Sequence, residues 1–275
     1  MKGCVNVDMD TLCEDLVNKE TYELRSITYK KMLPKLLKLL RKHDIPATFF
    51  VIGKDCGPFK GIIKNLAKDY EIGNHSYSHN KQLVNLGYDR IFDDIKRSHE
   101  SLVDASGQEV AGFRAPGYTI NNDIIIALKN LNYKYDSSLN TSIVYYLLKK
   151  SLKLKYGKLI TTQKFHELLF KPKMKGIVEI PINKYLGYPL MSASLFFNYK
   201  LSKKIYPLIR KQTLNYAIHA TEFFDNEIRF EGGISSGLFK KIPYQKRILY
   251  FEEMLKYFKE NYELKTMKEI AKKNQ

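Results

Sequence analysis

The segment Gly73 to His79, with the sequence GNHSYSH, carries two histidines four residues apart. Residues at positions i and i+4 share one face of a helical turn, so His75 and His79 can offer two imidazole nitrogens to one metal ion. A solvated or core-satisfied histidine pair fits the same spacing, and the motif alone does not separate the two interpretations. A hydrolytic metal site therefore requires a third ligand and a carboxylate base elsewhere in the chain.

Two aspartates in the segment NVDMD are candidates for these roles. Asp8 and Asp10 lie at the end of the first apolar run, and side chains at i and i+2 of a strand project to the same side. Two carboxylates so close repel each other unless a cation or an arginine intervenes. We expect a metal ion to take one carboxylate and Arg114 the other. Two solvated aspartates in a turn are the alternative interpretation.

The other reactive side chains also lie at the ends of predicted strands. Arg114 follows VAGF, Asp136 ends YKYD and His219 ends NYAIH. A lone histidine in a strand is more often a packed core residue than a catalytic one. The carboxyl ends of parallel strands converge on one face of an α/β barrel, however, and this is where such folds place their chemistry. The shared position favours one site.

Short apolar runs alternate with helical repeats along the chain, which predicts a parallel sheet, open or closed into a barrel. The predicted strands are CVNV, ATFFVIG, EIG, VAGF, YKYDSS, GIVEIPI, NYAIH and YELKT. The predicted helices cover residues 33–40, 61–70, 88–107, 121–132, 244–262 and 267–273, and the one at 121–132 begins with an asparagine cap.

The composition is that of a folded protein, with 44% hydrophobic and 27% charged residues in 275. One domain is expected at this length. Three cysteines without metal-type spacing predict reduced thiols. The first residues, MKGCVNVDMD, enter an apolar alternation at once and do not have the pattern of a leader peptide, and no apolar run reaches the length of a membrane span. We therefore expect a cytoplasmic protein.

The net charge of +17 is concentrated in one stretch. Residues Lys149 to Lys211 contain fifteen Lys or Arg residues and only two acidic residues, Glu167 and Glu179. With the aromatic residues around YLGYPLMSASLFFNY, this stretch fits an anionic membrane surface or a pyrophosphate group. Ordinary strands beneath a solvated lysine-rich surface are the alternative interpretation.

As an ordered set, the motifs resemble those of the NodB-like polysaccharide deacetylases, carbohydrate esterase family four. The segments that carry the resemblance are NVDMD, IPATFFVIG, EIGNHSYSH, VAGFRAPGYTI, YKYDSSL, VEIPI and AIHATEF, in the family's order from Val5 to Phe223. The resemblance implies an α/β fold, a distorted parallel (β/α) barrel of about seven strands. It would form a single domain over residues 1–275, with a basic, aromatic-rich insertion at about 141–211.

The resemblance also implies a metal centre. Asp10, His75 and His79 correspond to the ligands of one divalent ion, with zinc expected and cobalt, nickel, manganese or iron as alternatives. The family's usual reaction is removal of an N-acetyl group from an amino sugar.

Four further residues receive roles from the same resemblance. Asp8 corresponds to the catalytic base, Arg114 to its orienting partner and His219 to the general acid. Asp136 corresponds to the carboxylate that orients or charges His219.

Two departures from the family bear on the substrate. Met9 separates two aspartates that are usually adjacent, and AIHATEF replaces the commoner leucine-x-histidine, so that Ala217 and Ile218 are expected to line an acetyl pocket. We expect an N-acylated amino sugar carried on a polyprenyl phosphate or a nucleotide, processed at the inner face of the cell membrane. Alternatives are deformylation of a lipid-linked amino sugar, hydrolysis of a cyclic amide, or a basic module that binds anionic surfaces through an inert metal site. No nucleic acid partner is expected.

Overall fold

The computed structural model describes residues 1–10, 22–140, 176–185, 188–189, 191–192, 199–209, 212–225 and 242–272. The strands are β1 (Lys2–Asp8), β2 (Ala47–Val51), β3 (Glu71–Asn74), β4 (Gly112–Phe113), β5 (Tyr135–Asp136), β6 (Val178–Glu179), β7 (Lys184–Tyr185), β8 (Tyr188–Pro189), β9 (Leu214–His219) and β10 (Glu263–Leu264). The α-helices are α1 (Tyr22–Ile27), α2 (Leu33–Lys42), α3 (Cys56–Leu66), α4 (Tyr88–Ser106), α5 (Asn122–Asn130), α8 (Tyr199–Ile205), α10 (Tyr244–Asn261) and α11 (Met267–Lys272). Short π or 3-10 turns are η1 (Thr28–Met32), η2 (Gly53–Asp55), η3 (Leu83–Asn85), η4 (Pro116–Tyr118), η6 (Tyr206–Ile209) and η7 (Ala220–Phe223).

The main sheet is a distorted parallel barrel, as predicted. Within the described chain, β9, β1, β2, β3, β4, β5 and β6 pair in that order, all in parallel, and the short β10 pairs with the start of β1. Between β6 and β9 the contacts are sparser. They include a bridge from Met191 to Ala217 and a hydrogen bond from the Asn183 side chain to the carbonyl of Thr213 (3.0 Å).

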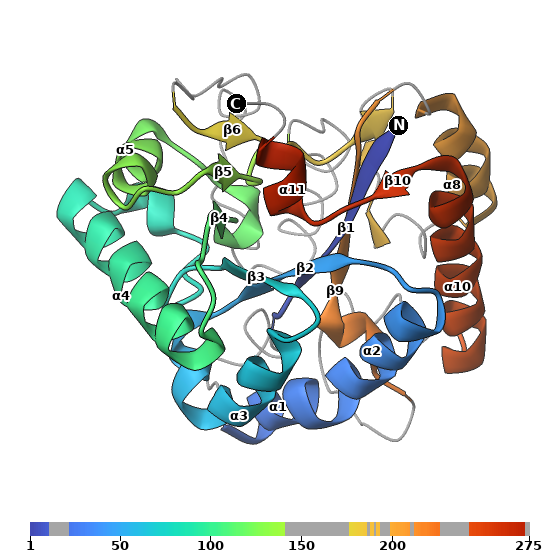
Figure 1. The fold of residues 1–275 in the computed structure, drawn as a ribbon, viewed down its shortest axis with the longest axis horizontal. Helices are drawn as coiled ribbons and strands as arrows, with labels where there is room; N and C mark the ends of the chain where they lie inside the picture. Colours follow the sequence, from blue (N-terminus) through green and yellow to red (C-terminus); the bar gives the residue numbers. More distant parts are fainter. Residues whose placement is uncertain are drawn as a thin grey trace, which may run out of the picture.

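Amphipathic helices cover the outside of the strands. Helices α5, α4, α3, α1, α2 and α10 follow one another around the barrel (Figure 1). In α2, Leu33, Leu36 and Leu40 are buried at helical spacing. The expected cap of α5 is present, because the Asn121 side chain accepts a hydrogen bond from the Ile124 N–H (2.9 Å). Helix α4 ends at Gly107, whose φ of 70° is a left-handed conformation that favours glycine.

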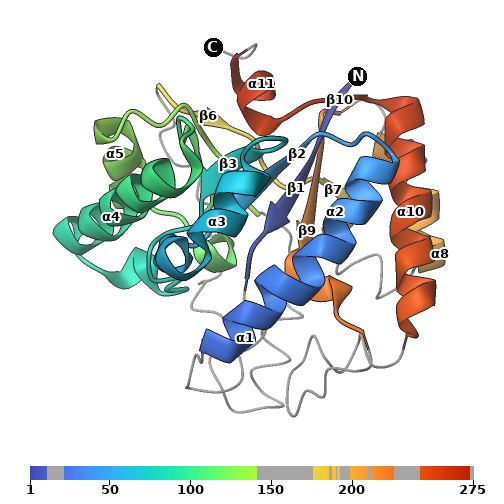
Figure 2. The ribbon, with the colours of Figure 1, turned by 60° about the horizontal axis from the view of Figure 1, so that its bottom comes forward.

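Helix α11 closes the amino-terminal end of the barrel. It lies beside the start of β1, opposite the ends toward which β1 and β9 point (Figure 2). Thr48 Oγ1 accepts the Met267 N–H (3.0 Å), and Glu71 Oε2 accepts the Lys268 N–H (3.1 Å). Tyr135 donates to the second oxygen of Glu71 (2.8 Å). The carboxyl ends of the strands are therefore the face left for a site.

Three further predictions concern the cysteines, the basic insertion and membrane-spanning helices. Cys4 and Cys56 are buried free thiols, and burial raises the pKa of each to about 12, which makes them poor nucleophiles. Cys13 lies outside the described residues, as does most of the predicted insertion at 141–211. Of the described helices, none has the length and apolar character needed to cross a membrane.

Candidate metal and catalytic site

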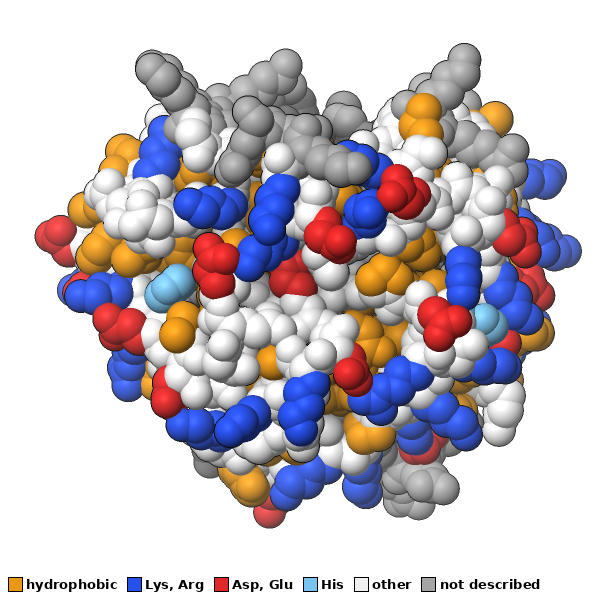
Figure 3. Space-filling view, viewed as in Figure 1, with side chains coloured by type: hydrophobic (Ala, Val, Ile, Leu, Met, Phe, Trp, Pro, Cys, Tyr) orange, Lys and Arg blue, Asp and Glu red, His pale blue; other side chains and the backbone are white. Residues whose placement is uncertain are grey.

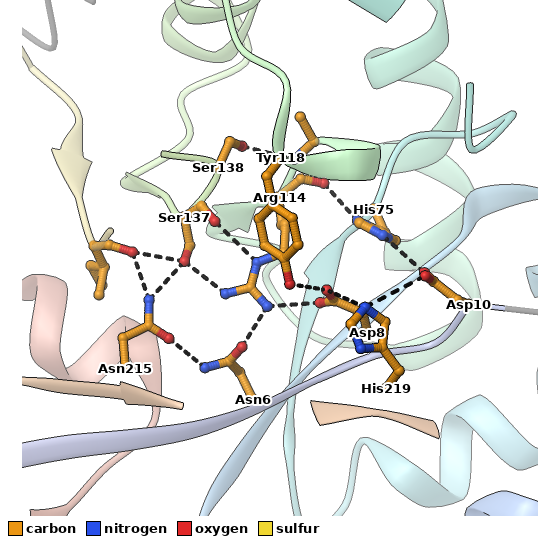
Figure 4. A network of polar contacts seen from close by, with 12 residues as sticks. Asn6, Asp8, Asp10, His75, Arg114, Tyr118, Ser137, Ser138, Asn215 and His219 are labelled. Carbon is orange, nitrogen blue, oxygen red and sulfur yellow. Dashed lines mark hydrogen bonds and ion pairs between the residues drawn. The ribbon is translucent and has the colours of Figure 1, made fainter. Parts of the chain in front are cut away.

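Side chains at the ends of β1 and β9, and just after β1, β3 and β4, meet at the carboxyl end of the barrel. Figure 4 shows Asp8, Asp10, His75, Arg114 and His219 directed toward one another from these four strands. Parallel pairing produces this convergence, because β3 joins β4 through Asn74 and Phe113, and the residues that follow these two positions are His75 and Arg114.

Asp10, His75 and His79 form a cluster with the donor set of a zinc site. One ligand atom from each lies within 4.8 Å of the other two. Asp10 Oδ1 is 3.2 Å from His75 Nε2 and 3.1 Å from His79 Nε2. Both histidines are buried, and the Asp10 side chain is 22% exposed, which leaves a path to solvent.

The orientation of His75 tests whether these residues fit a cation. Its Nδ1 lies 2.7 Å from the carbonyl oxygen of Arg114, an acceptor, so Nδ1 carries a proton. In the neutral ring the lone pair is then on Nε2, which faces a carboxylate oxygen of Asp10. Two lone pairs at this distance repel each other unless a proton or a cation lies between them. The cluster therefore fits one divalent ion, with an outer carbonyl fixing the tautomer as in known zinc sites.

Burial and neighbouring charges shift the pKa of Asp10 in opposite directions. Burial raises its pKa, but the charge of His79 and hydrogen bonds from His75 and His79 outweigh burial and hold the pKa well below the ordinary 3.8. Asp10 is thus an anion at neutral pH, as a metal ligand must be.

The two histidines lie in a loop. The expectation that a helical turn places them on one face was therefore wrong, although both imidazoles do meet at one point. Ser76 and His79 both have left-handed φ angles, 61° and 53°. The Asn74 side chain accepts the Ser76 N–H (2.7 Å), and Ser76 Oγ accepts the His79 N–H (3.0 Å). Asp94 of α4 accepts further hydrogen bonds from the N–H groups of Tyr77 (2.8 Å) and of the next residue (3.1 Å). These side chains replace helical hydrogen bonds and bring both imidazoles to one point.

Asp8 lies beside this cluster in a buried pair with Arg114. Arg114 Nη1 donates to Asp8 Oδ1 (2.7 Å), and the Tyr118 hydroxyl donates to Oδ2 (2.9 Å). Burial raises the pKa of Asp8, but the positive charge of Arg114, followed by those of His75 and His219, outweighs burial and lowers it. Asp8 is therefore held ionised and oriented, with Arg114 as the partner that was predicted.

A buried polar network fixes Arg114 in turn. Its Nε donates to the carbonyl oxygen of Ser137 (3.0 Å) and its Nη2 to Ser137 Oγ (2.7 Å), while Nη1 also donates to Asn6 Oδ1. Asn6 donates to Asn215 Oδ1 (2.6 Å). Sequence reasoning missed Asn6, Asn215 and Tyr118. The usable signal was strand periodicity, since Asn6 precedes Asp8 by two positions and Asn215 precedes His219 by four, on the same faces.

His219 faces the two aspartates from β9. Its Nε2 lies 3.8 Å from Asp8 Oδ2 and 3.8 Å from Asp10 Oδ2, and its Nδ1 lies 3.4 Å from Glu222 Oε1. Burial lowers the pKa of His219, but the hydrogen bond to Glu222 and the charges of Asp10, Glu222 and Asp8 raise it to about 9. This environment favours the protonated imidazole.

Asp136 does not contact His219, contrary to the role expected for it. Its two oxygens accept the Oγ–H and N–H of Ser138 (2.6 and 2.9 Å), and the carboxyl group lies against Glu179. Among the described residues, the carboxylate beside His219 Nδ1 is that of Glu222, which follows it by three positions. Asp136 ends a different strand, and its own turn satisfies its oxygens.

Ala217 and Ile218 point to opposite sides of β9. Ala217 lies in a small interior cluster with Tyr118, Ile182 and Met191, whereas Ile218 belongs to the core between strands and helices. Only Ala217 can line a pocket inside the barrel, because successive strand residues alternate between faces.

The basic stretch Lys149 to Lys211 lies largely outside the described residues. On the molecular face drawn in Figure 3, Lys and Arg side chains are dispersed among Asp and Glu side chains and do not form one patch. The expected membrane surface stays a prediction.

Comparisons with known proteins agree with this fold and with the family that the motifs resemble. The Polysaccharide deacetylase family model matches residues 22–135. A peptidoglycan deacetylase of Helicobacter pylori is 29% identical over 157 residues, which cover 56% of this chain and 53% of that protein. A peptidoglycan-N-acetylglucosamine deacetylase of Bacillus cereus is 33% identical over 93 residues, which cover 33% of this chain and 34% of that protein. The chain thus matches about half or less of the length of these relatives.

The fold is shared over a longer range than the sequence. A crystal structure from Mycobacterium smegmatis, assigned as a polysaccharide deacetylase, superposes with a TM-score of 0.64 at 18% identity, covering 98% of this chain and 88% of that one. The family model includes His75, His79 and Arg114, while the strands that carry Asp8 and His219 lie outside it. Residues 22–135 therefore match the polysaccharide deacetylase family, the relationship that the motifs predicted.

Proposed function

We propose that this protein is a metal-dependent hydrolase that removes the N-acetyl group from an amino sugar. One observation carries the proposal: Asp8, paired with Arg114, and His219, beside Glu222, lie next to the Asp10, His75 and His79 cluster, with His219 Nε2 3.8 Å from both aspartates. The names of the family and of the peptidoglycan deacetylase relatives support the same reaction class.

Asp10, His75 and His79 would hold the metal ion. When bound, a divalent ion supplies Lewis acidity, which polarises the amide carbonyl and makes a water molecule more acidic. This matters because an aspartate with a lowered pKa is a weak base towards bulk water.

The chain's own groups handle the protons. Asp8 accepts a proton from the attacking water, and Arg114 holds that carboxylate in position through Nη1. His219 Nε2 gives its proton to the amine nitrogen as the C–N bond breaks, so the amine leaves neutral. Amide hydrolysis requires such a pair beside the cluster, an unprotonated base and a protonated acid.

The substrate we propose is an N-acylated amino sugar on a lipid or nucleotide carrier, processed at the inner face of the membrane. Support comes from the described end of the basic stretch, where Lys200, Lys203 and Lys204 are exposed next to Leu201 (41% exposed) and Leu208 (60% exposed). Exposed lysines beside exposed apolar side chains fit an anionic lipid surface. Salt-dependent capture on vesicles containing anionic lipid is expected, and no capture at low ionic strength would remove this part of the proposal.

Substitution of the two aspartates tests the reaction. We expect Asp10→Ala to lose zinc on dialysis, whereas Asp8→Asn retains zinc and loses about 100- to 10,000-fold in turnover, the usual contribution of acid–base catalysis. Asp93→Asn, at an exposed position of α4, is the matched control for a lost negative charge. Released acetate and formate are measured in parallel on an N-acetylated and an N-formylated hexosamine. Full turnover by Asp8→Asn would exclude Asp8 as the base.

A further inference from the structure

The imidazole of His219 needs a partner that fixes which nitrogen faces the reaction. We propose that Glu222, three residues after His219, is this positioning residue. The inference rests on the proposed function, in which His219 Nε2 donates a proton to the leaving amine. It assigns to Glu222 the part that sequence reasoning gave to Asp136.

Glu222 is held as a rigid, buried carboxylate. The residue is 2% exposed. Its Oε1 accepts the hydroxyl of Ser192 (2.6 Å), and its Oε2 accepts the main-chain N–H of His219 (3.3 Å). From α10, Arg247 donates to the carbonyl oxygens of Glu222 and Phe224, both at 2.6 Å. The turn η7 is thus fixed to β9 on one side and to α10 on the other, and the carboxylate has little freedom to move away from His219.

The position of this carboxylate determines which ring nitrogen faces it. Nδ1 of His219 lies 3.4 Å from Glu222 Oε1, so a proton on Nδ1 is favoured by the negative charge. The same turn also has the form of a capping box, in which Nδ1 would accept the Glu222 main-chain N–H and carry no proton. A hydrogen bond to a charged acceptor is about twice as strong as a neutral one, and we therefore infer that Nδ1–H faces the carboxylate.

The contact at Nδ1 also affects Nε2, the other ring nitrogen of His219. The contact of Nδ1 with Glu222 favours the ring orientation in which Nε2 is directed at the space between Asp8 and Asp10. Its distance of 3.8 Å from either carboxylate is too long for a direct hydrogen bond, so Nε2 is free to donate to a group that enters this space. A ring that could flip would spend part of its time with the wrong nitrogen at the substrate.

Glu222→Gln keeps the shape of the side chain and removes its charge. We expect kcat to fall by about 10- to 100-fold, the usual effect of losing a group that orients a functional side chain, with KM within about twofold of the wild type. Ser192→Ala leaves the carboxylate but releases one of its anchors, so a smaller decrease in kcat is expected. The control is Glu71→Gln, which changes a buried, hydrogen-bonded glutamate at the opposite end of the barrel. It is expected to lower stability and leave kcat unchanged.

A spectroscopic measurement separates positioning from a structural role. The chain has only six histidines, so the ring signals of His219 in protein labelled with ¹⁵N-histidine can be assigned by their loss in His219→Gln. We expect a hydrogen-bonded proton on Nδ1 in the wild-type protein, with and without zinc. That signal should be shifted or lost in Glu222→Gln and retained in Glu71→Gln.

Different results would contradict the role of Glu222 and the proposed function. An unprotonated Nδ1 in the wild type, or wild-type kcat in Glu222→Gln, would overturn the assignment of Glu222. Absence of deacetylation by the zinc-loaded wild-type protein would instead count against the proposed function, and the Nδ1 signal would still decide whether Glu222 orients the ring. Equal losses of kcat in Glu222→Gln and Glu71→Gln would show that only general destabilisation is involved.

Discussion

The buried pair of Asp8 and Arg114 allows a quantitative test of how the site is held together. Arg114 is 0% exposed and Asp8 is 1% exposed, and the hydrogen bond between them is 2.7 Å long. Removing one partner of a buried ion pair typically costs about 3–5 kcal/mol, because the other charge is left without compensation. A typical domain has only about 5–15 kcal/mol of stability in total. We therefore expect Arg114→Met to lose a large share of the free energy of unfolding.

A second substitution makes the test specific, because its effect on stability should change sign between two backgrounds. In the wild type, Asp8→Asn removes a charged acceptor of Arg114 and should destabilise by about 1.5–3 kcal/mol. In the Arg114→Met background the same change removes an uncompensated buried charge, so it should stabilise. The coupling energy between the two sites is the loss in the wild type plus this gain, and it should therefore exceed about 1.5–3 kcal/mol. Urea denaturation of the four proteins at pH 7, with a chelator present, measures both effects.

The pH dependence gives an independent check on the same variant. Arg114 is the principal group that lowers the pKa of Asp8 against the effect of burial. Without it, burial raises the pKa of Asp8, so the folded protein binds a proton more tightly than the unfolded chain and stability falls as pH rises. Arg114→Met should thus lose less stability, relative to the wild type, at pH 5 than at pH 7. Equal destabilisation by Asp8→Asn in both backgrounds, with no dependence on pH, would refute the argument.

Three further changes test other parts of the molecule. Burial and the negative charge of Asp136 hold the pKa of Glu179 well above the ordinary 4.5. Stability that is present at acidic pH is therefore lost as pH rises. Glu179→Gln should make the melting temperature less dependent on pH between pH 5 and 9. A Cβ at Gly112 would lie 1.8 Å from Tyr135 Cζ, so Gly112→Ala should lower the melting temperature seen by circular dichroism, and an unchanged value would contradict this packing. Met267 of α11 is fully buried, and Met267→Ala should cost about 2–5 kcal/mol in urea denaturation without changing zinc affinity at the opposite end of the barrel.

The class of fold and most of the candidate site could be predicted from the order of the amino acids alone. Apolar runs such as ATFFV and helical leucine repeats appear as β2 and α2 because local periodicity fixes which face of each element is buried. Asp10, His75 and Arg114 could be found because few residue types bind metals or pair with carboxylates, and parallel strands bring their carboxyl ends together whatever the helices between them do.

The carboxylate that contacts His219 Nδ1 could be identified from the packing of the folded chain but not from the sequence. Asp136 and Glu222 are both acidic residues close to strand ends, and their positions in the chain do not rank them. The chain turn after β5 directs Asp136 to Ser138, while the turn after β9 returns Glu222 to the imidazole. Likewise, the loop that carries His75 and His79 depends on Asp94, which comes from α4. Contacts of this kind depend on how separate elements pack and on the direction of single turns, and these are set by the whole fold and not by local periodicity.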